Sequence, residues 1–214
     1  MLRCFKERND IVKRYTQNEI NELSDILKRD GVISVPTDTV YGVCARMNSK
    51  KARENLMIIK NRPATKSLPI MCADKEQIKS IAIVDERVEK LISTFMPGPI
   101  TLVLLKGPGV PVYVNEGSPE IGVRMATSKA LEDLIRKVGS PICMTSANKS
   151  GEPTCTTLEE IEKTFPTLDG IMEGNVSFGM GSTIVDCTSE SIKILREGPI
   201  SMKQIIEALE TSLS

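Results

Sequence analysis

Residues 32–42, V-I-S-V-P-T-D-T-V-Y-G, are the stretch that indicates most about how this chain folds. Residues 32–35 form a short β-branched run, which is typical of a buried strand. The segment from Pro36 to Gly42 then brings two hydroxyls, a carboxylate and a phenol to the carboxyl end of that strand, where open α/β sheets place their ligands. Pro36, Asp38 and Gly42 are also common turn formers. The stretch therefore predicts a strand followed either by a binding loop or by an ordinary turn.

Helical and extended patterns alternate on both sides of this stretch. Thr16 and Glu19 have the spacing of a capping box ahead of an apolar helical face, and Gly31 is placed to end that helix. Further helices are expected to begin at Ser49, Asp74, Asp85, Ser128, Thr157 and Ser201. Short apolar runs that favour strands lie at residues 32–35, 68–72, 101–105, 121–124, 141–144, 183–187 and 192–195.

This alternation indicates the α/β class, in which helices cover a sheet. The spacing is too irregular for a pure doubly wound repeat, so we expect a mixed sheet with some antiparallel pairs. No interdomain linker, internal repeat or low-complexity segment interrupts the 214 residues. We therefore expect a single domain over residues 1–214, which is long enough to bury its own core.

The composition excludes several kinds of site. The chain has no histidine, which removes Ser-His-Asp and Cys-His catalysis and histidine-ligated zinc. Its 28 basic and 28 acidic residues lack the basic excess of a dedicated nucleic-acid binder, although a local basic groove is compatible with a neutral total. Cysteines at positions 4, 44, 72, 143, 155 and 187 form no C-x-x-C pair and are interpreted as buried, reduced thiols.

The N-terminal residues are too charged for a signal peptide, and no apolar stretch approaches the roughly 20 residues of a membrane span. We therefore expect a cytoplasmic protein without a membrane partner.

Three further places combine cations or hydroxyls with strand or helix ends. Lys60-Asn61-Arg62-Pro63, followed by Lys66, either complements a helix dipole or clamps a polyphosphate. The loop T-S-A-N-K-S-G at 145–151 suits an anion or an Asx turn, and it lacks the Gly-Lys-Ser/Thr of a Walker A loop. Arg124 and Arg196 end strands, and Ser182 opens one. Basic and hydroxyl residues at strand ends favour an anionic ligand such as a nucleotide.

The order of these motifs along the chain resembles that of a known protein family. The chain is similar to the YrdC-like threonylcarbamoyl-AMP synthase family, in its short single-domain form, over about residues 14–207. Seven motifs occur in the family's order: P-T-D-T-V-Y-G at 36–42, K-N-R-P at 60–63, P-G-P-I-T at 97–101, G-V-R at 122–124, S-A-N-x-S-G at 146–151, G-S-T-I-V-D at 181–186 and L-R-E-G at 195–198. The resemblance implies an open, twisted mixed sheet with flanking helices around a large basic cavity.

The resemblance also implies roles for individual residues. Lys60 and Arg62 would be the catalytic residues. The threonine would be bound by Thr39, Tyr41, Arg124 and Ser182. The ATP would be bound by Lys60, Arg62, Lys66, Ser146, Asn148, Thr154 and Arg196.

The implied activity joins L-threonine, bicarbonate or CO₂, and ATP into threonylcarbamoyl-AMP and pyrophosphate, a nucleotidyl transfer that serves the N6-threonylcarbamoyladenosine modification of tRNA at position 37. Mg²⁺ would arrive with ATP, with no metal ligand from protein side chains. A downstream threonylcarbamoyl-transferase complex would receive the product, and tRNA or double-stranded RNA is a further expected contact.

Three positions depart from the family pattern. Lys66-Ser67-Leu68 stands where the family often has a Pro-Leu pair, Met71 stands where many members have His, and Met125-Ala126 follows Arg124 where a Pro often comes next. These departures bear on amino-acid selectivity more than on the reaction type. Two alternatives remain at this point. One is a non-catalytic module that binds double-stranded RNA or tRNA. The other, a carbamoyl-phosphate-processing enzyme, would need acylphosphatase and zinc-finger regions for which the length and cysteine spacing leave no room.

Overall fold

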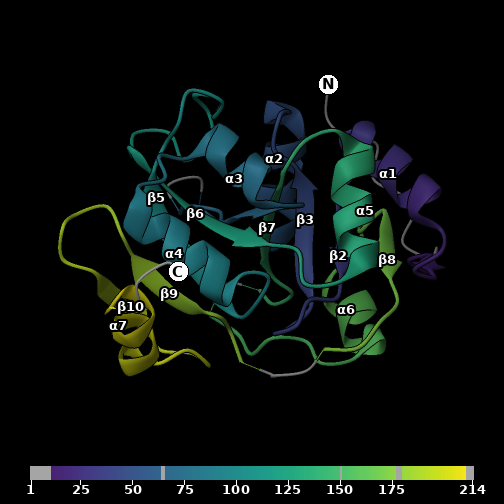
Figure 1. Ribbon diagram of the computed structural model, residues 1–214. Coiled ribbons are helices and arrows are strands. Elements are labelled where there is room, and N and C mark those ends of the chain that lie inside the picture. Colours follow the sequence, from purple (N-terminus) through teal and green to yellow (C-terminus); the bar gives the residue numbers. More distant parts are fainter. Residues whose placement is uncertain (1–10, 64–65, 150, 177–179, 211–214) are drawn as a thin grey trace.

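The computed structural model describes residues 11–63, 66–149, 151–176 and 180–210, which form one twisted sheet with helices packed on it (Figure 1). The described strands are β1 (Arg14–Tyr15), β2 (Ile33–Val35), β3 (Gly42–Arg46), β4 (Ile70–Cys72), β5 (Ile100–Leu105), β6 (Glu120–Met125), β7 (Ile142–Ser146), β8 (Gly170–Met172), β9 (Thr183–Asp186) and β10 (Lys193–Arg196). The described helices are α1 (Ile20–Lys28), α2 (Lys50–Lys60), α3 (Lys75–Ile81), α4 (Glu86–Phe95), α5 (Lys129–Val138), α6 (Leu158–Thr164) and α7 (Met202–Glu210).

The sheet is mixed, as expected, and its strand order is β1-β8-β2-β3-β7-β4-β6-β5-β9-β10. Parallel pairs join β1 with β8, β8 with β2, β4 with β6, and β5 with β9. The other neighbours are antiparallel. The consequence for function is that β2, β3, β7, β4, β6, β5 and β9 lie side by side, although they come from positions throughout the chain.

The helix starts follow the predicted caps. The side chains of Ser49, Asp74, Asp85, Ser128 and Thr157 each accept a hydrogen bond from a backbone N–H in the first turn of the helix that follows. Ser201 and Gln204 exchange hydrogen bonds at the start of α7. The capping box predicted at Thr16 and Glu19 is only half formed. The Glu19 carboxylate accepts from the Thr16 backbone N–H and hydroxyl, but α1 begins at Ile20 and has no side-chain cap.

All seven expected strand runs contain a strand, but β1, β3 and β8 were not predicted. The omission of β3 matters most, because β3 pairs antiparallel with β2 from Val35 opposite Gly42 to Ile33 opposite Cys44. Residues 36–41 are therefore the connection of a β2–β3 hairpin rather than a loop that leads from a strand into a helix.

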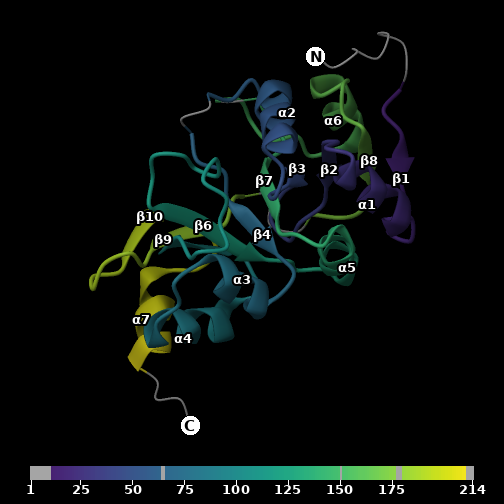
Figure 2. The ribbon, with the colours of Figure 1, turned by 90° about the horizontal axis from the view of Figure 1, so that it is seen from above.

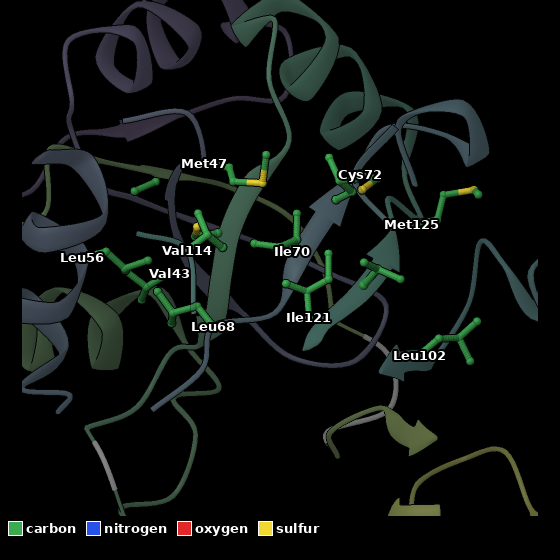
Figure 3. Packing of buried hydrophobic residues seen from close by; sticks show 14 of the residues in the cluster. Val43, Met47, Leu56, Leu68, Ile70, Cys72, Leu102, Val114, Ile121 and Met125 are labelled. Atoms are coloured by element: carbon green, nitrogen blue, oxygen red, sulfur yellow. The ribbon is translucent and has the colours of Figure 1, made fainter. Parts of the chain in front are cut away.

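The core is mainly aliphatic and forms two clusters, one with residues of α2, α3 and α4 and the other with residues of α1 and α5. Leu102 and Ile121 are buried in the first cluster with Leu56 of α2 (Figure 3). Val123 belongs to the same cluster. Figure 2 shows α3, α4 and α7 gathered beside β6, β9 and β10, and α1 and α5 near β2 and β8. None of the helices among the described residues is both long and apolar enough to cross a membrane.

Candidate active site

A cavity of about 440 Å³ is lined by residues of β3, β7, β4, β6, β5, β9 and β10 and of the β2–β3 connection. The floor of the cavity is formed by every second side chain of the strands, because successive side chains of a strand point to opposite faces of the sheet. On β6, Ile121 and Val123 enter the core while Glu120, Gly122 and Arg124 face the cavity. On β5, Leu102 and Leu104 are in the core, and Thr101 and Val103 line the cavity.

The cavity is basic, as the resemblance implied. Among the described residues, the charged side chains that line it are Arg62, Arg124, Arg196 and Glu120. The rest of the polar lining is mainly hydroxyl and amide groups: Thr37, Thr39, Ser67, Thr101, Asn115, Ser118, Thr145, Ser146 and Ser182. Three cations against one carboxylate favour an anionic ligand.

Arg124 is buried at the end of β6 and is held by the β2–β3 connection. Its Nη2 donates to Asp38 Oδ1 at 2.7 Å and to the Gly98 carbonyl at 3.3 Å, and its Nη1 donates to Thr39 Oγ1 at 3.2 Å. Burial lowers the pKa of Arg124, and the Asp38 carboxylate opposes that shift. Among the described residues, Arg124 Nε and Asp38 Oδ2 are buried without a hydrogen-bond partner, so this pair has hydrogen-bonding capacity left over.

Ser182 and Arg196 form a second polar group on the cavity wall, at the β9 side. Ser182 Oγ lies 2.7 Å from Thr101 Oγ1, and the Ser182 carbonyl accepts from Nε and Nη2 of Arg196 at 3.1 and 2.7 Å. Gly181 allows this arrangement, because a Cβ there would lie 2.7 Å from Nη2 of Arg196. Burial lowers the pKa of Arg196.

Arg62 reaches the cavity because α2 stops sharply in front of it. Asn61 adopts a left-handed conformation with φ of 47°, and the Arg62 backbone N–H bonds back to the Met57 carbonyl. The Arg62 Nη2 donates to the Ser67 carbonyl at 2.6 Å, while its buried Nε has no partner among the described residues. Burial lowers the pKa of Arg62.

Lys60 differs from the expectation that it lines the cavity with Arg62. It is 2% exposed, is absent from the described lining, and its Nζ donates to the carbonyls of Ser146 and Asn148 just behind the wall. The physical reason is that backbone carbonyls at the end of β7 need a donor, and the last residue of α2 is placed to supply it. Burial, together with the nearby Arg62, lowers the pKa of Lys60 to about 8.

The other predicted site residues also fall into two groups, those that line the cavity and those that do not. Thr39, Arg62, Arg124, Ser146, Ser182 and Arg196 line the one cavity. Tyr41 is 3% exposed and points elsewhere, since its hydroxyl donates to the Gly174 carbonyl. Asn148 folds its amide back on the Lys149 and Glu152 carbonyls and accepts from the Ser146 hydroxyl. Lys66 and Thr154 are outside the lining of the cavity, and Ser150 of the S-A-N-x-S-G motif lies outside the described residues.

Sequence reasoning missed part of the lining. Thr37, Thr101, Glu120 and Gly122 face the cavity. The alternation along β5 and β6 is the signal that would have found the last three, because each lies two residues from a recognised motif residue or from another lining residue. Met71, noted only as a departure, is 1% exposed and lines the cavity opposite Arg124 in the β4–β6 register.

The described cysteines do not line the cavity. Cys44, Cys72, Cys143, Cys155 and Cys187 are buried and free, and burial raises the pKa of Cys143 and Cys187 to about 12. Cys4 lies outside the described residues. The residues that the structure describes include no group of three or more Cys, Asp or Glu side chains that could hold a metal ion.

Comparisons with known proteins show which proteins the chain and its fold are similar to. The chain is 33% identical over 207 residues to a Methanocaldococcus jannaschii protein provisionally named threonylcarbamoyl-AMP synthase, covering 92% of this chain and 97% of that one. It is 31% identical over 199 residues to threonylcarbamoyl-AMP synthase of Pyrococcus abyssi, covering 92% of this chain and 58% of the longer relative. The crystal structure of P. abyssi Sua5 complexed with L-threonine superposes with a TM-score of 0.87 at 29% identity, covering 94% of this chain and 61% of that one.

The family model Sua5/YciO/YrdC, described as "Telomere recombination", matches residues 25–198. Together with these relatives, the match shows that the chain belongs to the Sua5/YciO/YrdC family.

Proposed function

We propose that this chain is a threonylcarbamoyl-AMP synthase, a nucleotidyltransferase that uses L-threonine, bicarbonate or CO₂, and ATP. The observation that carries the proposal is the single cavity that holds Arg62, Arg124 and Arg196 beside the hydroxyls of Thr39 and Ser182. The similar P. abyssi Sua5 was crystallised with L-threonine, which supports an amino-acid site in the same fold.

Arg124 is the best group for the amino-acid carboxylate. Its guanidinium is a fixed donor whose Nε lacks a partner among the described residues, and a carboxylate is the group that such a fork binds best. Thr39 lies 3.2 Å from Nη1 of Arg124, so it can contact the amine next to that carboxylate.

Arg62, Ser146 and Arg196 are the groups that we assign to ATP. Arg62 and Arg196 provide two more cations to the lining of the cavity, and the Ser146 hydroxyl lines it from the end of β7. Lys60 would act from behind this wall, by holding the backbone of Ser146 and Asn148 in place for the triphosphate.

The chemistry suits a chain without histidine. The neutral amine of threonine forms a bond to the carbon of CO₂, and the nitrogen then loses a proton to give a carbamate. A carbamate oxygen attacks the α-phosphorus of ATP, and the bond from that phosphorus to the bridging oxygen breaks as pyrophosphate leaves. The protein's part is to hold the partners in line and to stabilise the developing charge, which arginines and oriented hydroxyls can do.

Magnesium would come with the triphosphate. The only carboxylate among the described lining residues is Glu120, so the chain offers too few hard ligands for a site of its own. When bound with ATP, the ion would neutralise phosphate charge. We also propose that the product passes to a threonylcarbamoyl-transferase that modifies tRNA.

The test is pyrophosphate release with ATP, Mg²⁺ and bicarbonate, with L-threonine, L-serine or no amino acid. We expect release that depends on L-threonine and threonylcarbamoyl-AMP as the product. Lys60→Ala and Arg62→Ala should each lower kcat/KM by at least a hundredfold, a typical loss when groups that stabilise transition-state charge are removed.

Arg29→Ala is the matched control, because Arg29 is exposed at the end of α1 and is outside the described lining. It should leave the rate unchanged. Full activity in both the Lys60 and Arg62 variants would reject their roles. Salt-sensitive retention of RNA with no threonine-dependent release would instead favour a non-catalytic RNA-binding module.

A further inference from the structure

The hydroxyls of Thr37 and Thr39 form a hydrogen-bond chain whose direction can be worked out. Thr37 Oγ1 donates to the Val40 carbonyl at 2.6 Å. A threonine hydroxyl carries one hydrogen, and a carbonyl oxygen can only accept, so this bond uses the only hydrogen that Thr37 has. Towards every other neighbour Thr37 Oγ1 is an acceptor with two lone pairs. The backbone N–H groups of Thr39 and Val40, both at 3.2 Å, share one of them, which leaves the other for the Thr39 hydroxyl at 2.9 Å.

This fixes the Thr39 hydroxyl. Thr39 Oγ1 lies 2.9 Å from Thr37 Oγ1, and since Thr37 has no hydrogen left to give, Thr39 is the donor of that bond. On its other side Thr39 Oγ1 accepts from Nη1 of Arg124, which can only donate. The one free position on Thr39 Oγ1 is therefore a lone pair, and both threonines line the cavity.

Arg124 and Thr39 thus offer a ligand a donor beside an acceptor, since Nη1 of the same guanidinium lies 3.2 Å from Thr39 Oγ1. An α-amino acid has the complementary pair, a carboxylate that accepts and an amine that donates, on one carbon. It also matters for the reaction that Thr39 accepts a hydrogen bond rather than donates one. The substrate amine must attack carbon with its nitrogen lone pair, and a hydroxyl that donated to the neutral amine would occupy that lone pair.

We infer that Thr37 is a positioning residue for the amino-acid substrate. By holding the Thr39 hydroxyl as an acceptor, it directs an N–H of the substrate amine to Thr39 and leaves the nitrogen lone pair free. The inference rests on the proposed function and adds a residue and an orientation to it. Thr37 also shapes the turn through its backbone contacts, so a test must separate this orienting effect from a general effect on the cavity.

The experiment is a double-mutant cycle in which one change removes the Thr37 hydroxyl and the other removes the amine of the ligand. Binding of L-threonine and of (R)-3-hydroxybutanoate, which keeps the carboxylate and hydroxyl but lacks the amine, is measured by calorimetry on the full chain. The variants are Thr37→Val, which removes the hydroxyl at nearly constant shape, and Thr37→Ser, which keeps it. In the wild type we expect L-threonine to bind at least tenfold more tightly than the analogue.

In Thr37→Val, we expect affinity for L-threonine to fall about fivefold to tenfold, the effect of one hydrogen bond, while affinity for the analogue stays within about twofold. Thr37→Ser should restore the wild-type ratio. In the pyrophosphate assay, the KM for L-threonine should rise in Thr37→Val while the KM for ATP is unchanged. An equal loss for both ligands would mean that Thr37 only shapes the turn, and would overturn the inference.

If Thr37→Val does not fold, Thr37→Ser and Thr39→Val decide the question. Thr39→Val should lose the preference for the amine-bearing ligand and Thr37→Ser should keep it; loss of the preference in Thr37→Ser would overturn the inference. A wild-type chain that binds both ligands equally would instead count against the proposed function itself. A wild-type preference that persists in Thr37→Val would reject only the role of Thr37.

Discussion

At the scale of single residues, Gly181 controls the position of an arginine in the cavity. A Cβ at this position would lie 2.7 Å from Nη2 and 2.8 Å from Cζ of Arg196, closer than nonbonded atoms approach. We expect Gly181→Ala to push the guanidinium away from the Ser182 carbonyl and to raise the KM for ATP about tenfold in the pyrophosphate assay, roughly the effect of one charge-assisted hydrogen bond.

The control for this prediction is a double variant. If Gly181→Ala acts by moving Arg196, it should add little to the effect of Arg196→Ala, because the two changes share one cause. Additive losses would show that Gly181 acts on the ligand by another route.

The Asp38–Arg124 pair gives a second prediction at this scale. Both side chains are largely buried, at 15% and 10% exposure, so removing one charge leaves the other uncompensated. We expect Asp38→Asn to lower the free energy of unfolding by about 3 kcal/mol in urea titrations without ligand. L-threonine should recover part of that loss, since its carboxylate supplies the missing negative charge.

Asp133→Asn is the matched control for that change. Asp133 pairs with Lys129 on the surface of α5, with side chains 41% and 73% exposed, and its loss should change stability by less than about 0.5 kcal/mol. Equal effects of the two substitutions would argue against a special role for the buried pair.

Sequence reasoning reached some of these residues and missed others for a physical reason. Arg62, Arg124 and Arg196 could be predicted as a group because cations at strand and helix ends are conspicuous in an otherwise apolar context. Thr37 could be identified only as one of two hydroxyls in the 36–42 segment, and Gly122 only as part of a motif. A threonine beside a proline and a glycine in a strand resemble turn formers or weak points until the sheet brings them to one cavity.

At the scale of elements, the end of α2 meets the end of β7, and Lys60 joins them. Its pKa of about 8 lies below the value near 10.5 of an unfolded chain, because burial disfavours the charged form. The unfolded state then binds more protons than the folded state between these two values, so stability rises with pH across that window.

We therefore expect the stability of the wild type, relative to Lys60→Met, to increase by about 3 kcal/mol between pH 7 and pH 11. Urea unfolding of both proteins at both pH values measures the difference, in which the titration of shared groups cancels. A difference that does not change with pH would mean that Lys60 titrates normally.

The unpredicted strands belong to this scale too. β3 holds Gly42 and small residues, and β8 has three residues, so neither has the long β-branched run that marks a strand locally. β8 forms because β1 and β2, far away in the sequence, pair with it, and β3 forms between its hairpin partner β2 and the distant strand β7. Helix caps are local hydrogen bonds, which is why the helix starts could be predicted and these strands could not.

At the scale of the whole molecule, strand β6 turns alternate side chains to the core and to the cavity. Along β6, Val123 is fully buried in the core, whereas Gly122 lies on the cavity floor between Glu120 and Arg124. The fold itself does not demand a glycine there. A Cβ at position 122 would lie 3.3 Å from Cγ2 of Thr101 and 3.9 Å from Pro69, which requires only a slight shift.

Neighbouring substitutions on this strand should therefore have opposite effects. Gly122→Ala should raise the free energy of unfolding by about 0.5 kcal/mol, because alanine loses less backbone entropy on folding, while the added methyl fills the floor and raises the KM for L-threonine about tenfold. Val123→Ala should lower stability by about 2 kcal/mol through the space left in the core, with the KM unchanged below its unfolding transition. Urea unfolding and pyrophosphate release on the same preparations measure both quantities. A Gly122→Ala protein that is less stable but binds threonine normally would show that the glycine is needed for packing. It would also show that the cavity-facing positions of β6 are not specialised for binding.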